Sequence, residues 1–328
     1  MYDFDPSVWQ GRVDPEDGQL GLRWHQQVQP WHEQAAAGVC LLRFATDEGV
    51  RRNQGRPGAI EGPGKVLKAL ANQAWHRQTP VWDAGEVRCA DGNLEASQEQ
   101  VGARLHRVLQ QGQLPLLIGG GHEIAWASYQ GLYRYLAEQN RNKSFPTIGI
   151  INFDAHFDLR VGHGQGSSGT PFWQIAEHCQ SLGHPFRYAC LGVNPGANTQ
   201  ALFQRAEELG VWYRLDSQMN SWQLTDIRAQ LASFISQCDG IYLSIDLDVL
   251  PAATAPGVSA PAGRGVALEL IEVLIADIVE AHQQGICPLW LADIAEYNPS
   301  FDLDGRTAKV AARLLTQLAT ATEQPADY

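Results

Sequence analysis

Residues 147–158 read TIGIINFDAHFD and change character abruptly after Phe153. The first part is mainly apolar and rich in β-branched isoleucine, a pattern that predicts a buried strand. The second part carries three ionisable side chains within five positions, Asp154, His156 and Asp158. Burying such groups is costly unless they pair with one another or bind a cation. The stretch therefore predicts a strand of a central sheet with a functional site at its carboxyl end.

Similar apolar runs recur along the chain and predict eight strands, at Gly38–Phe44, Val81–Val87, Leu114–Ile118, Thr147–Phe153, Arg187–Val193, Val211–Arg214, Ile241–Ile245 and Pro288–Ile294. Helical patterns separate most of them, such as Glu123–Gln139, Asn198–Leu209, Ser221–Gln237, Ala267–His282 and, after the last strand, Thr307–Ala321. Strands alternating with helices are typical of a mainly parallel sheet covered on both faces. An eight-stranded barrel shares this alternation and is the main alternative for the fold.

The domain organisation follows from the same pattern. The 328 residues contain no internal repeat, low-complexity segment or linker, so one large domain is the simpler interpretation. Residues 1–36 are polar and contain tryptophan without a clear period. We expect them to form an N-terminal arm packed on a single catalytic domain at residues 37–328.

Composition narrows the partners and the location. A formal net charge of −12 argues against nucleic acid, because phosphate binding needs clustered Lys and Arg. The six cysteines are scattered and form no Cys-x-x-Cys pair, as expected for free thiols in a reducing compartment. The sequence shows neither a secretion signal nor an apolar run long enough to span a membrane. We therefore expect a cytoplasmic protein that acts on a small molecule.

Four polar motifs directly follow apolar runs. They are Gly119-Gly120-Gly121-His122-Glu123, Asp154-Ala155-His156-Phe157-Asp158, Asp246-Leu247-Asp248 and Asp293-Ile294-Ala295-Glu296-Tyr297-Asn298. In a parallel sheet the carboxyl ends of the strands meet at one edge, where α/β folds bind their ligands. We therefore expect these residues, remote in sequence, to converge on one crevice.

Two imidazoles and four carboxylates in that crevice indicate metal binding, through His122, Asp154, His156, Asp158, Asp246 and Asp248. Such an oxygen-rich set suits Mn²⁺ or Fe²⁺ better than Zn²⁺. Four carboxylates would repel one another without cations, and two divalent ions would balance them. If the backbone is extended, alternate residues point to one side, which would align the three ionisable groups of 154–158 and the pair Asp246 and Asp248.

Simpler interpretations compete with the metal site. An Asp-x-Asp segment after a strand is often a helix cap or a turn. The three glycines before His122 could suggest a phosphate loop, but the Lys-Ser/Thr of that motif is absent. We expect these glycines to let the backbone turn tightly behind His122.

At these motifs the sequence resembles the ureohydrolase superfamily, which includes arginase and agmatinase, from about residue 38 onward. The resemblance implies a three-layer α/β/α fold with an eight-stranded mainly parallel sheet, two Mn²⁺ ions per subunit and a homo-oligomer. It places the first ion on His122, Asp154, Asp158 and Asp246. It places the second on Asp154, His156, Asp246 and Asp248.

The resemblance also implies the chemistry, in which water activated by two ions attacks a trigonal carbon bearing an imino nitrogen. Asp158 would orient that water and pass a proton to the leaving amine. Glu296 would hold the cationic amidine-like group of the substrate by charge-assisted hydrogen bonds.

Within the superfamily, three features look like the formimidoylglutamase subgroup: Gly121, the run from Asp47 to Arg56, and the segment Ser167-Ser168-Gly169-Thr170-Pro171-Phe172. Ser168 stands where arginase and agmatinase carry a proton-shuttling His, and His163 is a nearby candidate to replace it. The resemblance implies cleavage of N-formimidoyl-L-glutamate to L-glutamate and formamide, in histidine degradation.

A substrate with two carboxylates needs cations in its pocket. Arg160 follows the metal motif by two residues, and Arg56 lies in a loop after the first expected strand. Both can bind a carboxylate through two parallel hydrogen bonds, and Ser168 completes the expected substrate-binding set. Two alternatives remain open: an agmatinase or guanidino-acid hydrolase that releases urea, and a metal-binding scaffold without activity.

Overall fold

The computed structural model describes residues 4–141, 143–162 and 164–324, so that His163 lies outside the described residues. Its strands form one sheet in the order β1-β3-β2-β4-β9-β8-β5-β6-β7, with every neighbouring pair parallel. The bounds of the strands are β1 Gln29–Pro30, β2 Val39–Ala45, β3 Val81–Arg88, β4 Leu114–Gly119, β5 Ile148–Phe153, β6 Arg187–Val193, β7 Trp212–Leu215, β8 Gly240–Asp246 and β9 Leu289–Ala295.

The predicted parallel α/β fold is confirmed, with one strand more than expected. Strands β2 to β9 correspond to the eight predicted runs. The additional strand, β1, has only two residues, which pair with Trp82 and Asp83 of β3. The sequence Gln-Pro does not favour a strand, so β1 is a strand only because it pairs with β3. The barrel alternative is wrong, because the sheet is open and ends at β1 and β7.

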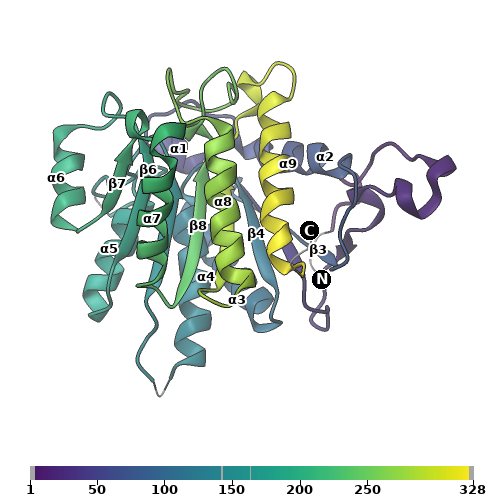
Figure 1. The fold of residues 1–328 in the computed structure, drawn as a ribbon, viewed down its shortest axis with the longest axis horizontal. Helices are drawn as coiled ribbons and strands as arrows, with labels where there is room; N and C mark the ends of the chain where they lie inside the picture. The colour runs from purple at the N-terminus through teal and green to yellow at the C-terminus, as the bar shows by residue number, and fades with distance from the viewer. Residues whose placement is uncertain (1–3, 142, 163, 325–328) are drawn as a thin grey trace.

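Helices cover both faces of the sheet (Figure 1). Their bounds are α1 Glu48–Arg52, α2 Gly62–Ala71, α3 Leu94–Gln110, α4 Ile124–Gln139, α5 Pro171–Leu182, α6 Gln200–Glu208, α7 Leu224–Ile235, α8 Leu268–Gln283 and α9 Arg306–Ala319. The alternation along β2 shows the two cores: Leu41 belongs to the core cluster that also contains residues of α2, α7, α8 and α9, whereas Leu42 belongs to the cluster that contains residues of α3, α4 and α5. This gives the three layers.

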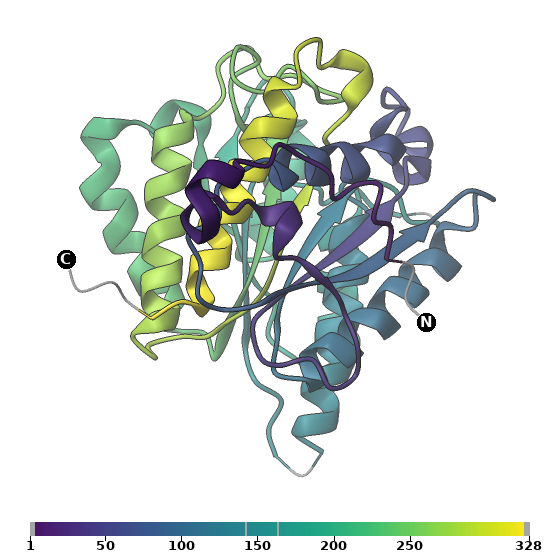
Figure 2. The ribbon, with the colours of Figure 1, turned by 90° about the vertical axis from the view of Figure 1, so that its right-hand side faces the viewer.

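The N-terminal residues lie against this domain rather than apart from it (Figure 2). Trp24 is fully buried and joins the core under α2. Trp9 is also buried, and its indole Nε1 donates a hydrogen bond of 2.8 Å to Asp83 in β3. The tryptophans therefore fasten the segment to the edge of the sheet. In the described part of the chain, no helix combines the length and apolar character that crossing a membrane requires.

The topology also places the four polar motifs. The strands that precede them, β4, β9, β8 and β5, are four consecutive neighbours in the sheet. Because they are parallel, their carboxyl ends meet at one edge, near the middle of the sheet. The motifs therefore emerge side by side, as the sequence predicts.

Candidate metal centre

His122 reaches the site from a tight turn after β4. A Cβ atom on Gly120 would lie 1.7 Å from the Thr46 carbonyl oxygen, and one on Gly121 would lie 2.1 Å from Glu123 Oε2. Neither glycine adopts a left-handed backbone. The expected tight turn behind His122 is present, but it does not require a left-handed backbone at these glycines. They are needed because neighbouring atoms approach the backbone too closely for any side chain.

Residues 154–158 bring three ionisable side chains together without being extended. Asp154 Oδ1 accepts the His156 backbone N–H at 2.6 Å, and Asp158 has a left-handed φ of 49°. The condition for the alternation, an extended backbone, is therefore not met in this segment. A left-handed backbone is uncommon for residues other than glycine, although Asp adopts it more readily than most.

Asp246 and Asp248 combine the two interpretations that the sequence left open. Asp246 ends β8 and caps the short 3-10 helix Leu247–Val249, with its Oδ1 accepting the Asp248 N–H at 2.8 Å. Both carboxyl groups nevertheless line the same cavity. Asp246 can therefore cap the 3-10 helix with Oδ1 and contribute Oδ2 to the site, because a carboxylate has two oxygens.

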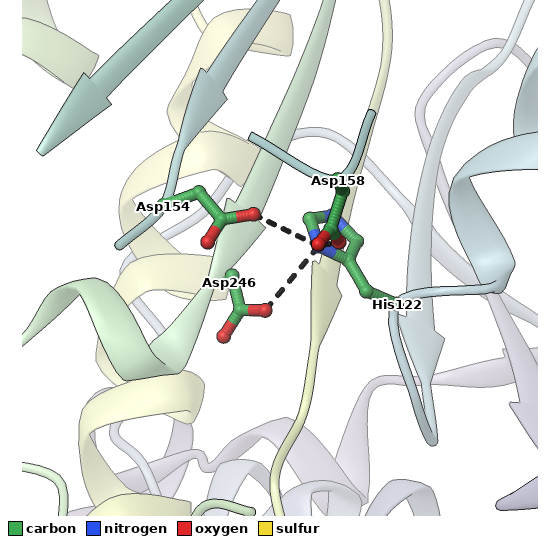
Figure 3. Close-up of side chains that lie close together, drawn as sticks. All are labelled: His122, Asp154, Asp158 and Asp246. Carbon is green, nitrogen blue, oxygen red and sulfur yellow. Dashed lines mark ion pairs between the residues drawn. The ribbon is translucent and has the colours of Figure 1, made fainter. Parts of the chain in front are cut away.

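Four side chains converge on one point in Figure 3, with the His122 imidazole facing three carboxylates. His122 Nδ1 lies 3.1 Å from Asp154 Oδ2, 2.9 Å from Asp158 Oδ2 and 3.2 Å from Asp246 Oδ2. Ligand atoms of these four residues all lie within 4.8 Å of one another. The group matches the ligand set predicted for the first ion.

A second group shares Asp154 with the first. His156 Nδ1 lies 3.0 Å from Asp248 Oδ2 and 3.5 Å from Asp154 Oδ1. These three residues also satisfy the spacing of a metal site. Asp246 was expected here as well, but among the described residues it belongs to the first group alone, and its Oδ1 is occupied by the Asp248 N–H. Its bridging role stays a prediction.

The donor set fits a cation. Within the described structure, His122 Nδ1 is buried and makes no hydrogen bond of acceptable geometry, although three carboxylate oxygens surround it. Such an arrangement of acceptors is stable only if a proton or a metal ion lies between them. Hard carboxylate oxygens with one imidazole per group suit Mn²⁺.

Without metal, this crowding shifts the pKa values of the site. Burial alone would lower the pKa of His122, but the carboxylates of Asp154, Asp158 and Asp246 around its Nδ1 raise it well above its usual range. Burial and the Asp154 charge raise the pKa of Asp158 to about 6. Burial favours a raised pKa for Asp154, yet the adjacent imidazoles of His122 and His156 lower it. The raised pKa values favour the protonated forms of His122 and Asp158 when no metal is bound.

The stability of the metal-free protein should consequently fall as pH rises. Groups with a raised pKa, such as His122 and Asp158, bind more protons in the folded state, so folding loses their contribution as pH passes through the folded-state pKa. Mn²⁺ competes with those protons and should bind more tightly at higher pH. We expect Mn²⁺ to raise Tm by about 5 °C at about pH 8, from roughly 2.7 kcal/mol at a hundredfold excess over Kd, and by less at about pH 6.

Thermal unfolding with Mn²⁺ and with a chelator at each pH measures the difference in Tm that the metal causes. A Tm difference that stays constant from mild acid to mild base would contradict the proposed ligand set.

A cavity of about 210 Å³ opens beside both groups, lined by Asn53, Gly55, His156, Asp158, Arg160, Ser168, Ala197, Asn198, Leu202, Asp246, Asp248, Ser259, Ala260 and Glu296. Candidate metal ligands and candidate substrate ligands thus share one space. This is the crevice that the four motifs predict.

Glu296 is a buried carboxyl group in this cavity. Its Oε1 accepts the His122 backbone N–H at 2.8 Å, and its backbone has a left-handed φ of 69°. Burial and the nearby Glu123 raise its pKa to about 8. A cationic group placed beside Glu296 would restore its charge at neutral pH, so the cavity favours a cation at this position.

Arg160 provides a cation in the same cavity. Its side chain is exposed and, among the described residues, has no hydrogen-bond or ion-pair partner. Ser168 is buried beside it, and Asn53 Nδ2 donates to Ser168 Oγ at 3.2 Å. A free guanidinium and a serine hydroxyl therefore face the same space.

Arg56 lies differently. Its guanidinium donates to the carbonyl oxygens of Val258 and Ser259, both at 2.7 Å, and stacks 3.7 Å from the centre of the Phe301 ring. It does not line the cavity, although its neighbour Gly55 and its partner Ser259 do. Arg56 thus fastens the Ser259 loop, and direct contact with substrate stays a prediction.

Asn198 and Asn53 were missed by the sequence analysis. The Asn198 Nδ2 donates to the Ala155 carbonyl at 2.9 Å, and its Oδ1 accepts the Phe157 N–H at 3.1 Å. It therefore holds the metal-binding loop in shape. Nothing in the local sequence marks Asn198, whereas Asn53 lies inside the run from Asp47 to Arg56 that carries the subgroup resemblance.

Comparison with known proteins gives consistent results. The model of the Arginase family matches residues 37–320. Formimidoylglutamase of Aeromonas hydrophila is 58% identical over 316 residues, covering 96% of this chain and 97% of that protein. The corresponding protein of Chromobacterium violaceum is 50% identical over 315 residues, covering 96% and 98%.

Solved structures share the fold. Formimidoylglutamase from Bacillus subtilis superposes with a TM-score of 0.76 at 21% identity, covering 92% of each chain. Trypanosoma cruzi formiminoglutamase, solved with Mn²⁺, gives a TM-score of 0.73 at 24% identity, covering 88% of this chain and 95% of that one.

Proposed function

The chain belongs to the arginase family, and from this premise we propose that it is a binuclear-metal hydrolase that cleaves N-formimidoyl-L-glutamate. Water is consumed, and L-glutamate and formamide are released. The proposal is supported by relatives named formimidoylglutamase at up to 58% identity. The urea-releasing alternative and the inactive scaffold are not favoured, since these relatives match over nearly their whole length.

One observation carries the proposal: the cavity beside the two candidate metal groups is lined both by a buried carboxyl group, Glu296, and by Arg160, whose guanidinium has no partner among the described residues. N-formimidoyl-L-glutamate has the complementary charges, an amidine-like head and two carboxylates. Arginine and agmatine offer a cationic head as well, but agmatine has no carboxylate for Arg160. The pair of charges therefore favours an acidic substrate.

His122, Asp154, Asp158 and Asp246 would hold one ion, and Asp154, His156 and Asp248 the other. Two divalent ions at this position supply a water nucleophile activated near neutral pH and charge stabilisation of the transition state. We propose manganese because of the carboxylate-rich ligands and because a related fold has been solved with Mn²⁺.

The protein side chains then orient and transfer protons. Asp158 lines the cavity, where its carboxylate would orient the attacking water, accept a proton from it and pass that proton to the leaving amine. Glu296 holds the amidine-like head in place through charge-assisted hydrogen bonds. Asp158 and Glu296 can stabilise the transition state only if the amidine-like head of the substrate is held in place before the water attacks.

The carboxylates of the substrate are bound at the other charged part of the cavity. The Arg160 guanidinium can form two parallel hydrogen bonds with one carboxylate. Because Asn53 donates to Ser168 Oγ, the Ser168 hydroxyl proton is free to be donated to a substrate oxygen. Ser168 and Asn53 therefore act together on an anionic ligand.

Arg160→Ala should weaken binding of the substrate by about 2 kcal/mol, or about 30-fold in KM, because a bidentate contact to a carboxylate is lost. We expect kcat to change much less, since Arg160 lies away from the reacting carbon. Steady-state kinetics of formamide release measures both constants. Arg264→Ala, an exposed arginine lining a different cavity, is the control with the same change of charge. A KM equal to that of the unmodified protein would remove Arg160 from the substrate site.

The Mn²⁺-loaded protein tests the function directly with a panel of N-formimidoyl-L-glutamate, arginine, agmatine and a guanidino acid. Formamide from the first compound and little urea from the others is the expected result. Urea from any guanidino compound at a higher rate would contradict the proposed substrate. We further propose a role in histidine degradation, a cytoplasmic location and a homo-oligomer, which rest on the family resemblance.

A further inference from the structure

Asp293 is a buried carboxylate that has no part in the chemistry described above. It lies on β9, where it pairs with Leu117 of β4 on one side and Ser244 of β8 on the other. Its side chain is inaccessible to solvent. Three hydroxyl groups donate to it at 2.6 Å, from Ser128 and Tyr242 to Oδ2 and from Ser244 to Oδ1.

The direction in which the Ser244 hydroxyl donates determines whether Nε2 of His122 carries a hydrogen. Ser244 Oγ lies 2.9 Å from His122 Nε2 and 2.6 Å from Asp293 Oδ1. A carboxylate only accepts, so the Ser244 proton goes to Asp293. Ser244 must then accept from His122, which requires the hydrogen of the ring on Nε2. The other ring nitrogen, Nδ1, is then the one that a metal ion or a second proton can occupy, and it faces Asp154, Asp158 and Asp246.

We propose that Asp293 is a positioning residue for the metal centre, acting through Ser244 on the tautomer and orientation of His122. This inference rests on the metal centre of the proposed function. Without Asp293, the Ser244 hydroxyl can rotate and donate to Nε2, which leaves the ring hydrogen on Nδ1, where the metal ion must bind. Partners of this kind, one step removed from the metal, commonly affect metal affinity by tenfold to a hundredfold.

The surrounding residues provide a matched control. Ser128 and Ser244 are both inaccessible serines that donate to Asp293 at 2.6 Å, but only Ser244 also contacts His122. Removing either hydroxyl costs Asp293 one hydrogen bond and leaves a small void. A role in packing or in satisfying the buried carboxylate would therefore affect both variants alike, whereas a role in metal binding separates them.

The experiment measures Mn²⁺ binding to the full chain by calorimetry, for the unmodified protein and for Ser244→Ala, Asp293→Ala and Ser128→Ala. Thermal unfolding of each metal-free variant is recorded beside it. We expect Ser244→Ala and Asp293→Ala to lower the affinity for one of the two Mn²⁺ ions by about tenfold to a hundredfold and to leave the affinity for the other nearly unchanged. Ser128→Ala should keep both affinities within about twofold.

Unchanged Mn²⁺ affinity in Ser244→Ala overturns the inference while leaving the metal centre intact. An equal loss in Ser128→Ala also overturns it, because the effect would then follow from the buried carboxylate alone. Failure of the unmodified protein to bind Mn²⁺ would instead overturn the metal centre of the proposed function, and the inference with it. If Asp293→Ala does not fold, the two serine variants still decide.

Discussion

Asp154→Asn should abolish binding of both Mn²⁺ ions and lower kcat by about a thousandfold or more, which corresponds to about 4 kcal/mol of transition-state stabilisation. The reason is that Asp154 belongs to both candidate groups: Oδ2 lies 3.1 Å from His122 Nδ1, and Oδ1 lies 3.5 Å from His156 Nδ1. An amide has one oxygen and a nitrogen that donates hydrogen bonds, so it cannot serve two cations.

Metal analysis of the dialysed variant together with its kinetics checks this result. Asp304→Asn, which removes a carboxylate on an exposed loop, is the control and should keep both ions and full activity. An Asp154→Asn variant that retained two ions per chain would show that the two groups do not share this carboxylate.

Glu296→Gln should lower kcat/KM by about a hundredfold without changing metal content, since a charge-assisted hydrogen bond is worth up to about 3 kcal/mol. Glutamine keeps an oxygen that can accept the His122 N–H, as Glu296 Oε1 does at 2.8 Å. The substitution therefore removes the negative charge facing the substrate and little else. The variant should lose interactions with the amidine-like head of the substrate and keep those with its carboxylates.

Kinetics with N-formimidoyl-L-glutamate and Mn²⁺ titration of the same preparation separate the two effects. Glu269→Gln on α8 is the control for the loss of one carboxylate outside the site. If Glu296→Gln lost metal in parallel with activity, Glu296 would support the metal ligands rather than hold the substrate.

The convergence of the site could be predicted from sequence because it depends on topology alone. Each motif, such as Asp154 after Phe153, follows an apolar run that is buried on both faces of the sheet. The carboxyl ends of parallel strands then lie at one edge of the sheet, regardless of how the side chains pack. The same reasoning identifies Glu296, although its motif is separated from His122 by more than half of the chain.

Other features could not be predicted because they depend on contacts between distant segments. The left-handed backbone of Asp158 has no local signal, and an extended segment was expected instead. Arg56 has the right charge and loop, but the carbonyl oxygens of Val258 and Ser259, some 200 residues away, hold its guanidinium. Asn198 shapes the metal loop from a third segment. Such partners are fixed by the folded arrangement, and no spacing in the sequence encodes them.

The most direct test of the account compares two substrates that differ only in the head group, N-formimidoyl-L-glutamate and its guanidino analogue, N-carbamimidoyl-L-glutamate. Both carry the two carboxylates, so the comparison isolates selection at Glu296 and Asp158 from selection at Arg160. With Mn²⁺ bound, we expect formamide release with a kcat/KM about a hundredfold above that of urea release. Urea release that equals or exceeds formamide release would contradict the proposed function and would make this chain a guanidino-acid hydrolase.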